Sequence, residues 1–154
     1  MEYLTVKTLH ILSSVVMVGT GFGTAFYLFF ANRSGSVPAI AVVARLVVRA
    51  DWWFTTPAVV FQPLSGIWMM HLGGIPWNTP WVVAALVLYL IAGLCWLPVV
   101  WLQLRMARLA QAAQAAGAAL PEQYWICARR WELLGYPAFG AMLAVYFLMV
   151  FKPV

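Results

Sequence analysis

The chain has 154 residues, of which 65% are hydrophobic and 8% carry a charge, and its mean hydropathy is +0.90. Water could not solvate a folded domain of this composition, so a soluble protein is excluded and we expect an integral membrane protein. The net charge of +5 does not indicate a nucleic-acid partner, because the arginines lie in two segments between apolar stretches instead of forming a basic stripe among exposed aromatic residues.

The first apolar segment, residues 4–30, predicts a transmembrane helix with Lys7 and His10 on one face. No small-residue cleavage site follows it, so we expect the segment to stay in the protein. An ionisable side chain inside a span costs free energy unless it has a partner or a function, which makes His10 a candidate functional residue. At about 100° per residue, a polar seam faces the bundle interior. Its members are Lys7, His10, Ser14, Met17, Gly21 and Thr24.

The second predicted span covers residues 52–72 and follows a turn at 31–38 and a helical segment at 39–50. Pro57 and Pro63 lie within this span, and each removes a backbone hydrogen bond, so we expect bends there. On an ideal helix His71 lies roughly opposite Gln62. A second polar seam follows from the spacing of Asp51, Thr55, Gln62, Ser65 and Met69.

Residues 81–104 and 135–151 predict the third and fourth spans. Between them, residues 110–119 are rich in alanine and glutamine, with good helix propensity but no clear hydrophobic face, so we expect a helical extension into solvent. The expected fold is therefore all-α, a single four-transmembrane-helix bundle spanning residues 1–154.

The distribution of Lys and Arg predicts the topology. All arginines lie in the first and third connections or their flanks, and the second connection has no Lys or Arg. By the positive-inside rule the two arginine-rich connections are cytoplasmic and both termini lie outside, as expected for a bacterial inner-membrane protein. This topology places four ionisable residues in the outer half of the membrane: Lys7, His10, His71 and Lys152.

His10 is a candidate axial ligand of haem b, because four-helix proteins build cofactor sites from side chains of facing helices. Lys7 or Lys152 would offset the haem propionates, and His71 is a candidate second axial ligand. The alternatives are a hydrogen bond from His10 to a carbonyl or to Ser14, and an interfacial position for His71 at a helix end. Neither cysteine belongs to a haem-attachment motif, so haem would be held non-covalently.

Other polar and sulfur-containing residues allow different chemistry. Copper is an alternative to haem, with Met17, Met69 and Met70 as candidate thioether ligands. Asp51 and Glu132 lie near arginines at the cytoplasmic interface. Ion pairs that fix helix ends are one interpretation of these two acids, and proton uptake or binding of an acidic substrate is the other.

Short motifs along the chain resemble the HemJ-type protoporphyrinogen oxidases and their CopD-like relatives. Lys7, His10 and Ile11 resemble the Lys-x-x-His-Ile opening of these proteins, Thr56-Pro57 followed by a glycine resembles their second span, and Lys152-Pro153 is similar to their ending. The whole chain looks closest to a family of small predicted integral membrane proteins of unknown function grouped with that superfamily. The resemblance implies that His10 binds haem and that Lys7 or Lys152 lies near it.

We therefore expect a haem b-binding membrane protein that takes part in electron transfer or oxidation, exchanging electrons with a quinone or a porphyrinogen. Whether it is itself an oxidoreductase stays open. One alternative is a non-catalytic subunit or assembly factor, acting as a homo-oligomer or within a larger membrane complex. The other is copper handling in the manner of CopD-like proteins.

Overall fold

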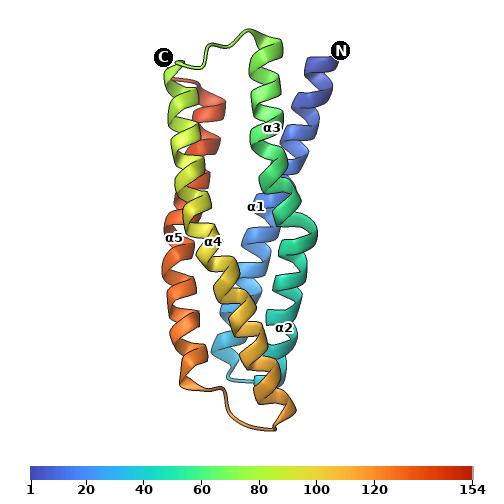
Figure 1. Cartoon of the computed structure of the whole chain (residues 1–154), viewed down its shortest axis with the longest axis vertical. Helices are drawn as coiled ribbons and strands as arrows, with labels where there is room; N and C mark the ends of the chain where they lie inside the picture. The colour runs from blue at the N-terminus through green and yellow to red at the C-terminus, as the bar shows by residue number, and fades with distance from the viewer. Residues whose placement is uncertain (154) are drawn as a thin grey trace.

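The computed structural model describes residues 1–153, and this part of the chain folds into helices with no strand. The helices run along one long axis (Figure 1). The all-helical expectation is confirmed. In chain order the elements are α1 (Glu2–Ser34), α2 (Val37–Ala50), the π-helical turn η1 (Asp51–Thr55), α3 (Thr56–Gly73), α4 (Pro80–Ala115) and α5 (Glu122–Phe151).

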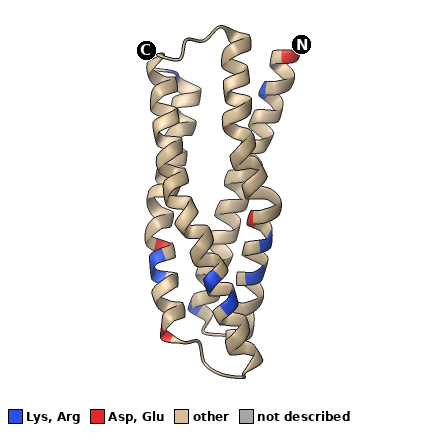
Figure 2. Cartoon of the chain, viewed as in Figure 1, with Lys and Arg blue, Asp and Glu red and all other residues tan. Residues whose placement is uncertain are grey.

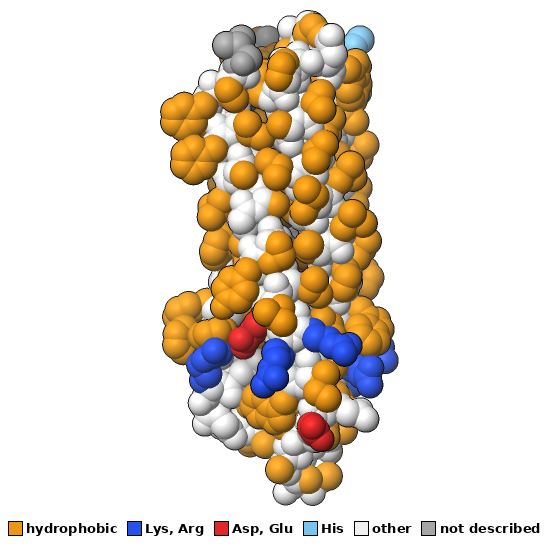
Figure 3. Space-filling view, turned by 90° about the vertical axis from the view of Figure 1, so that its left-hand side faces the viewer, with side chains coloured by type: hydrophobic (Ala, Val, Ile, Leu, Met, Phe, Trp, Pro, Cys, Tyr) orange, Lys and Arg blue, Asp and Glu red, His pale blue; other side chains and the backbone are white. Residues whose placement is uncertain are grey.

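Three of the described helices, α1, α4 and α5, are long and apolar enough to cross a membrane. Hydrophobic side chains cover most of the length of the face shown in Figure 3, and Lys and Arg side chains form a band near one end. Such a surface would aggregate in water but is well solvated by lipid. The expectation of an integral membrane protein is therefore confirmed.

The expected second span corresponds to α3, which has 18 residues. The backbone stays helical through Ala50 and Thr56, so α2, η1 and α3 follow one another as one long helical rod (Figure 1). The π-helical turn ends at Thr55, two residues before Pro57, whose missing N–H interrupts the regular hydrogen-bond ladder. The rod thus passes directly from the arginine-bearing α2 into the apolar α3.

The end of α1 and the start of α2 carry local sequence signals for the turn expected at residues 31–38. Gly35 has a φ of 68°, a left-handed conformation that ends α1 and that glycine adopts without strain. The Ser36 side chain then accepts a hydrogen bond of 3.5 Å from the backbone N–H of Ala39, and Pro38 occupies the first turn of α2. The chain therefore reverses direction within a few residues.

The best-packed part of the molecule is the arginine-rich end, which we define by Arg33, Arg45, Arg49, Arg105, Arg108, Arg129 and Arg130 (Figure 2). One buried cluster joins α1, α2, α4 and α5 here. It includes Leu28 of α1, Ile40 and Val47 of α2, Met106 of α4 and Tyr124 of α5. The Tyr124 hydroxyl donates a 2.6 Å hydrogen bond to Asn32 Oδ1, which fixes α5 against the end of α1.

The expectation that residues 110–119 extend into solvent without a partner face is wrong for the first half of that stretch. Helix α4 continues to Ala115, and Ala110 and Ala113 are buried, Ala110 completely. Ala110 belongs to the same cluster as Tyr124 and Ile40. Alanine gives little hydrophobic contrast in a sequence, but its small side chain lets neighbouring helices approach closely.

Toward the opposite end, where both termini lie, the helices separate into two pairs. Helix α1 packs along α3, and α4 packs along α5 (Figure 1). Helix α1 lies beside α3 near the termini and approaches α5 near the arginine-rich end. Helix α1 thus crosses from the side of α3 to the side of α5, and its middle part lines the cavity described below.

Candidate functional site

His10 lies at a polar contact between α1 and α3. Its Nδ1 atom is 2.7 Å from Ser65 Oγ, and Gln62 Nε2 donates a 2.8 Å hydrogen bond to the His10 backbone carbonyl. Gln62 and Ser65 are buried, as the second polar seam predicts for these two residues. The alternative partner Ser14 instead donates to the carbonyl of Ile11. Of the two alternatives to haem binding, the hydrogen bond between His10 and Ser14 is not formed, and Ser65 takes that place.

Ser65 Oγ has one proton to donate and three possible partners. The carbonyl oxygens of Phe61 and Gln62 lie at 2.7 and 3.2 Å, and His10 Nδ1 lies at 2.7 Å. When the hydroxyl donates to the Phe61 carbonyl, it accepts from His10 Nδ1–H. The neutral imidazole then has a free lone pair on Nε2, which is the form that binds a metal ion or accepts a proton.

The other residues predicted for a haem site do not contact His10. Lys7 and His71 are exposed. Gly66 faces the His10 ring, and His71 lies about a turn and a half farther along α3, toward the termini. The Lys152 ammonium lies 5.6 Å from the centroid of the Trp81 ring, on the α4 and α5 side of the molecule. The structure thus places Lys152 on the other helix pair, whereas Lys7 shares α1 with His10.

The copper ligands proposed from the sequence are also spread out. Met17 is buried on α1, whereas Met70 is buried and Met69 half-buried on α3. Residues 1–153 contain no group of three or more His, Cys, Asp or Glu side chains placed to hold a metal ion.

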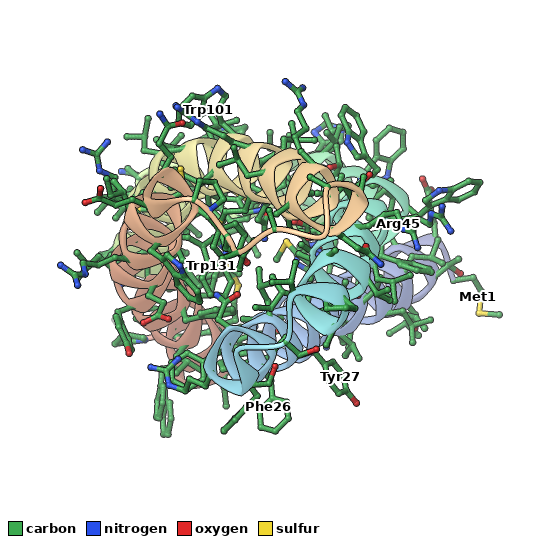
Figure 4. All side chains as sticks on the ribbon, turned by 90° about the horizontal axis from the view of Figure 1, so that it is seen from below. Met1, Phe26, Tyr27, Arg45, Trp101 and Trp131 are labelled. Atoms are coloured by element: carbon green, nitrogen blue, oxygen red, sulfur yellow. The ribbon has the colours of Figure 1, made fainter. Side chains whose placement is uncertain are left out.

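A cavity of about 440 Å³ lies in the middle of the molecule, between α1, η1, the start of α3, α4 and α5. Met17, Gly21 and Thr24, the members of the first polar seam nearest the arginine-rich end, line it. That part of the seam faces the interior as expected, whereas Lys7 does not. Most of the wall is apolar and much of it is aromatic, with Phe22, Trp96, Trp131 and Phe139 among its residues. Seen from the arginine-rich end, Trp131 lies inside the ring of helices and Tyr27 points outside it (Figure 4).

Two buried polar side chains, Asp51 of η1 and Gln103 of α4, reach this cavity. Asp51 is 5% exposed and Gln103 is 6% exposed. Asp51 Oδ1 accepts a 2.9 Å hydrogen bond from Thr55, whereas Asp51 Oδ2 and Gln103 Oε1 have no protein partner. Burial raises the pKa of the Asp51 carboxyl, which lies outside the three candidate spans, while the side chains of Thr55 and Gln103 oppose this shift.

The expected ion pairing is wrong for Asp51 and right for Glu132. Within the described residues the one ion pair joins Glu132 of α5 to Arg33 of α1 at 3.3 Å. The partner Arg33 lies on α1, whereas Arg129 and Arg130, which are close to Glu132 in the sequence, lie on α5. Asp51 instead points inward, because the π-helical turn carries Asp51 and Thr55 on the buried face of the rod.

Sequence reasoning missed Gln103 as a site residue. It is a polar side chain near the end of the apolar segment 81–104, and polar residues within spans face the protein interior. That signal identifies Gln103 as buried, but its position beside Asp51 depends on how α4 packs against the rod of α2 and α3.

These features define an all-helical integral membrane protein with an internal cavity. The chain belongs to the family described as predicted integral membrane protein (DUF2269), whose model matches residues 4–153. This confirms the expected membership of a membrane protein family of unknown function, while the relation to HemJ-type and CopD-like proteins stays a prediction. No curated protein and no solved structure matches the chain significantly.

Proposed function

We propose that the protein binds haem b through His10 and takes part in electron transfer or oxidation within the membrane. The observation that supports this proposal is the 2.7 Å contact between His10 Nδ1 and Ser65 Oγ, because the neutral tautomer that donates from Nδ1 keeps Nε2 free for iron. Histidines that bind metals commonly donate their other ring N–H to a protein acceptor, which fixes the ring and makes the free nitrogen more basic. The donor at position 10 therefore fits haem iron.

Each neighbouring residue has a separate role in this proposal. Ser65 orients the imidazole, and Gln62 holds the backbone of α1 at His10. Gly66 lies against the ring, where a Cβ would stand at an ordinary contact distance of 3.6 Å from His10 Cε1. Lys7, three residues from His10 on α1, is the better candidate to offset a propionate, because Lys152 lies over Trp81 on the other helix pair. Bound haem would supply one-electron chemistry at its iron.

The test of this proposal is a cofactor analysis of the protein purified in mild detergent. We expect a Soret band and about one haem b per chain by the pyridine haemochrome assay, with little copper by elemental analysis. Copper without haem would instead support the CopD-like alternative. A colourless, metal-free protein that co-purifies with a larger complex would support a non-catalytic subunit or assembly factor. Either of these results would overturn haem binding.

We also propose that α3 is the fourth membrane span and that the arginine-rich end is cytoplasmic, with both termini on the outer side of a bacterial inner membrane. In support, α3 contains no Asp, Glu, Lys or Arg, and all seven arginines named above lie toward one end of the molecule (Figure 2). Lys and Arg near span ends set the orientation of membrane proteins.

Alkaline phosphatase fused after Lys152 tests this topology, since the enzyme is active only outside the cytoplasm. We expect activity there and none for a fusion in the connection between α4 and α5, near Gly117. The opposite pattern would reverse the orientation. Activity at both positions would argue against α5 as a span. Fusions at Gly35, before α2, and at Gly74, after α3, test the proposed fourth span, and we expect activity only at Gly74. The same result at Gly35 and Gly74 would remove α3 as a span.

A further inference from the structure

We propose that the central cavity binds a lipid-soluble aromatic alcohol, of the phenol or quinol class, whose hydroxyl group hydrogen-bonds to Asp51 and Gln103. This site is distinct from the proposed haem ligand. The cavity begins at Met17, which is two helical turns, or roughly 10 Å, from His10 along α1. Its occupation therefore does not depend on haem at His10.

The size and lining of the cavity fit a small aromatic ring. Its volume of about 440 Å³ lies within the range of small-molecule pockets. Phe22 of α1, Trp96 of α4 and Phe139 of α5 contribute aromatic rings from three helices. Aromatic side chains stack favourably against other rings in offset or edge-to-face arrangements. An aromatic ligand would therefore pack against several walls at once.

Two polar side chains of the cavity wall identify the head group. Asp51 Oδ2 and Gln103 Oε1 are both acceptors, both are buried without a protein partner, and a small turn of each side chain would present them to a ligand. A buried acceptor left unpaired costs about 1 to 3 kcal/mol, so a ligand with a donor is favoured. A hydroxyl donates and also accepts, so it can pair with Asp51 in either protonation state. It also carries no charge into an apolar cavity, unlike an ammonium group.

The arrangement of α1 and α5 provides a route from the bilayer. These helices touch through the Phe22 and Phe139 rings, whose centroids are 4.2 Å apart, and again through the ion pair of Arg33 with Glu132. Between these contacts lie Phe26 and Tyr136, which line the cavity but are 59% and 69% exposed. The cavity therefore opens sideways between α1 and α5, toward lipid, as a lipid-soluble ligand requires.

Binding of decylhydroquinone to the full chain in lipid nanodiscs tests the proposal, with empty nanodiscs correcting for partition into lipid. We expect saturable binding near one ligand per chain. The dimethyl ether of the same compound keeps the ring and the alkyl chain but cannot donate, so we expect it to bind about tenfold more weakly or worse. Didecanoylglycerol, which has a hydroxyl but no ring, distinguishes a membrane lipid from an aromatic ligand and should also bind more weakly.

Paired variants locate the bound ligand. Gly93 lines the cavity and Gly140 does not, and a Cβ added at either position meets nothing within 4 Å. We expect Gly93→Leu to fill the cavity and abolish binding, and Gly140→Leu to leave it unchanged. Gln103→Leu should weaken binding about tenfold, whereas Gln111→Leu, on the exposed face of the same helix, should not. Gly135→Leu, at a separate part of the wall, replaces Gly93→Leu if that variant does not fold.

Equal binding of the hydroquinone and its ether would overturn the proposal, because a bound water would then satisfy the two acceptors. Equal or tighter binding of didecanoylglycerol would assign the cavity to a membrane lipid. Binding that survives both Gly93→Leu and Gly135→Leu would place the ligand elsewhere. None of these results depends on the haem content of the protein, so failure of the haem proposal and failure of this one are distinguishable.

Discussion

His10 Nδ1 and Ser65 Oγ lie 2.7 Å apart although the two residues are separated by 55 positions in the sequence. Ser65 Oγ also lies 2.7 Å from the Phe61 carbonyl, and when it donates there, His10 donates from Nδ1 and keeps Nε2 free. The contact joins the first polar seam of α1 to the second polar seam on α3. It holds the imidazole ring in the orientation on which the haem proposal rests.

Ser65→Ala tests the positioning role of Ser65. The variant removes the acceptor of His10 Nδ1–H and lets the ring rotate, so we expect haem affinity to fall about 10-fold to 100-fold, with a shifted Soret maximum. Ser65→Thr keeps the hydroxyl and should restore most of the affinity. Haem titration of the apoprotein measures both effects. Ser14→Ala is the matched control, and a loss of haem in that variant equal to the loss in Ser65→Ala would contradict the role of Ser65.

Tyr124→Phe tests the packing of the arginine-rich end. The Tyr124 side chain is fully buried, and its hydroxyl pairs with Asn32 Oδ1. Removing the hydroxyl leaves that buried acceptor without a donor, so we expect the free energy of unfolding to fall by about 1 to 3 kcal/mol. Reversible unfolding in mixed micelles measures the change. Tyr27→Phe removes an exposed hydroxyl from α1 and should change stability little, so an equal loss in both variants would argue against this packing.

Ala110→Leu tests whether the end of α4 is part of the core. Ala110 is completely buried with α2 and α5 around it, so a larger side chain must displace its neighbours. We expect destabilisation by about 1 to 3 kcal/mol, measured as a lower thermal unfolding midpoint. Ala112→Leu places the same side chain on the exposed face two residues away and should have little effect. An unchanged unfolding midpoint in Ala110→Leu would show that this segment is exposed to solvent.

The sequence was sufficient to predict the helical membrane fold, because hydrophobic length and the positions of proline and glycine are local signals. The burial of Gln62 and Ser65 followed from their common helical face. The contact of His10 with Ser65 did not follow from the sequence, because it depends on the register between α1 and α3. Periodicity on an ideal helix also could not show that a π-helical turn carries Asp51 inward, away from the arginines.

The cavity is a second feature that local patterns do not predict. Its walls come from five helical elements, and two of its buried polar side chains, Asp51 and Gln103, lie about fifty residues apart in the chain. Nor did hydrophobic contrast identify the packed face of residues 110–115, because it consists of alanine. In each of these cases the deciding information is the distance between elements, which depends on the packing of the whole bundle.

The most direct test of the central claim is the absorption spectrum of purified His10→Ala beside the unchanged protein and His71→Ala. We predict a Soret band in the unchanged protein and its loss in His10→Ala, at equal yield and helical content. In His71→Ala we expect the band to persist, since His71 is exposed at the far end of α3 and does not contact His10. A conversion from six-coordinate to five-coordinate haem in His71→Ala would identify His71 as the second axial ligand. A Soret band of full intensity in His10→Ala would contradict the assignment of His10.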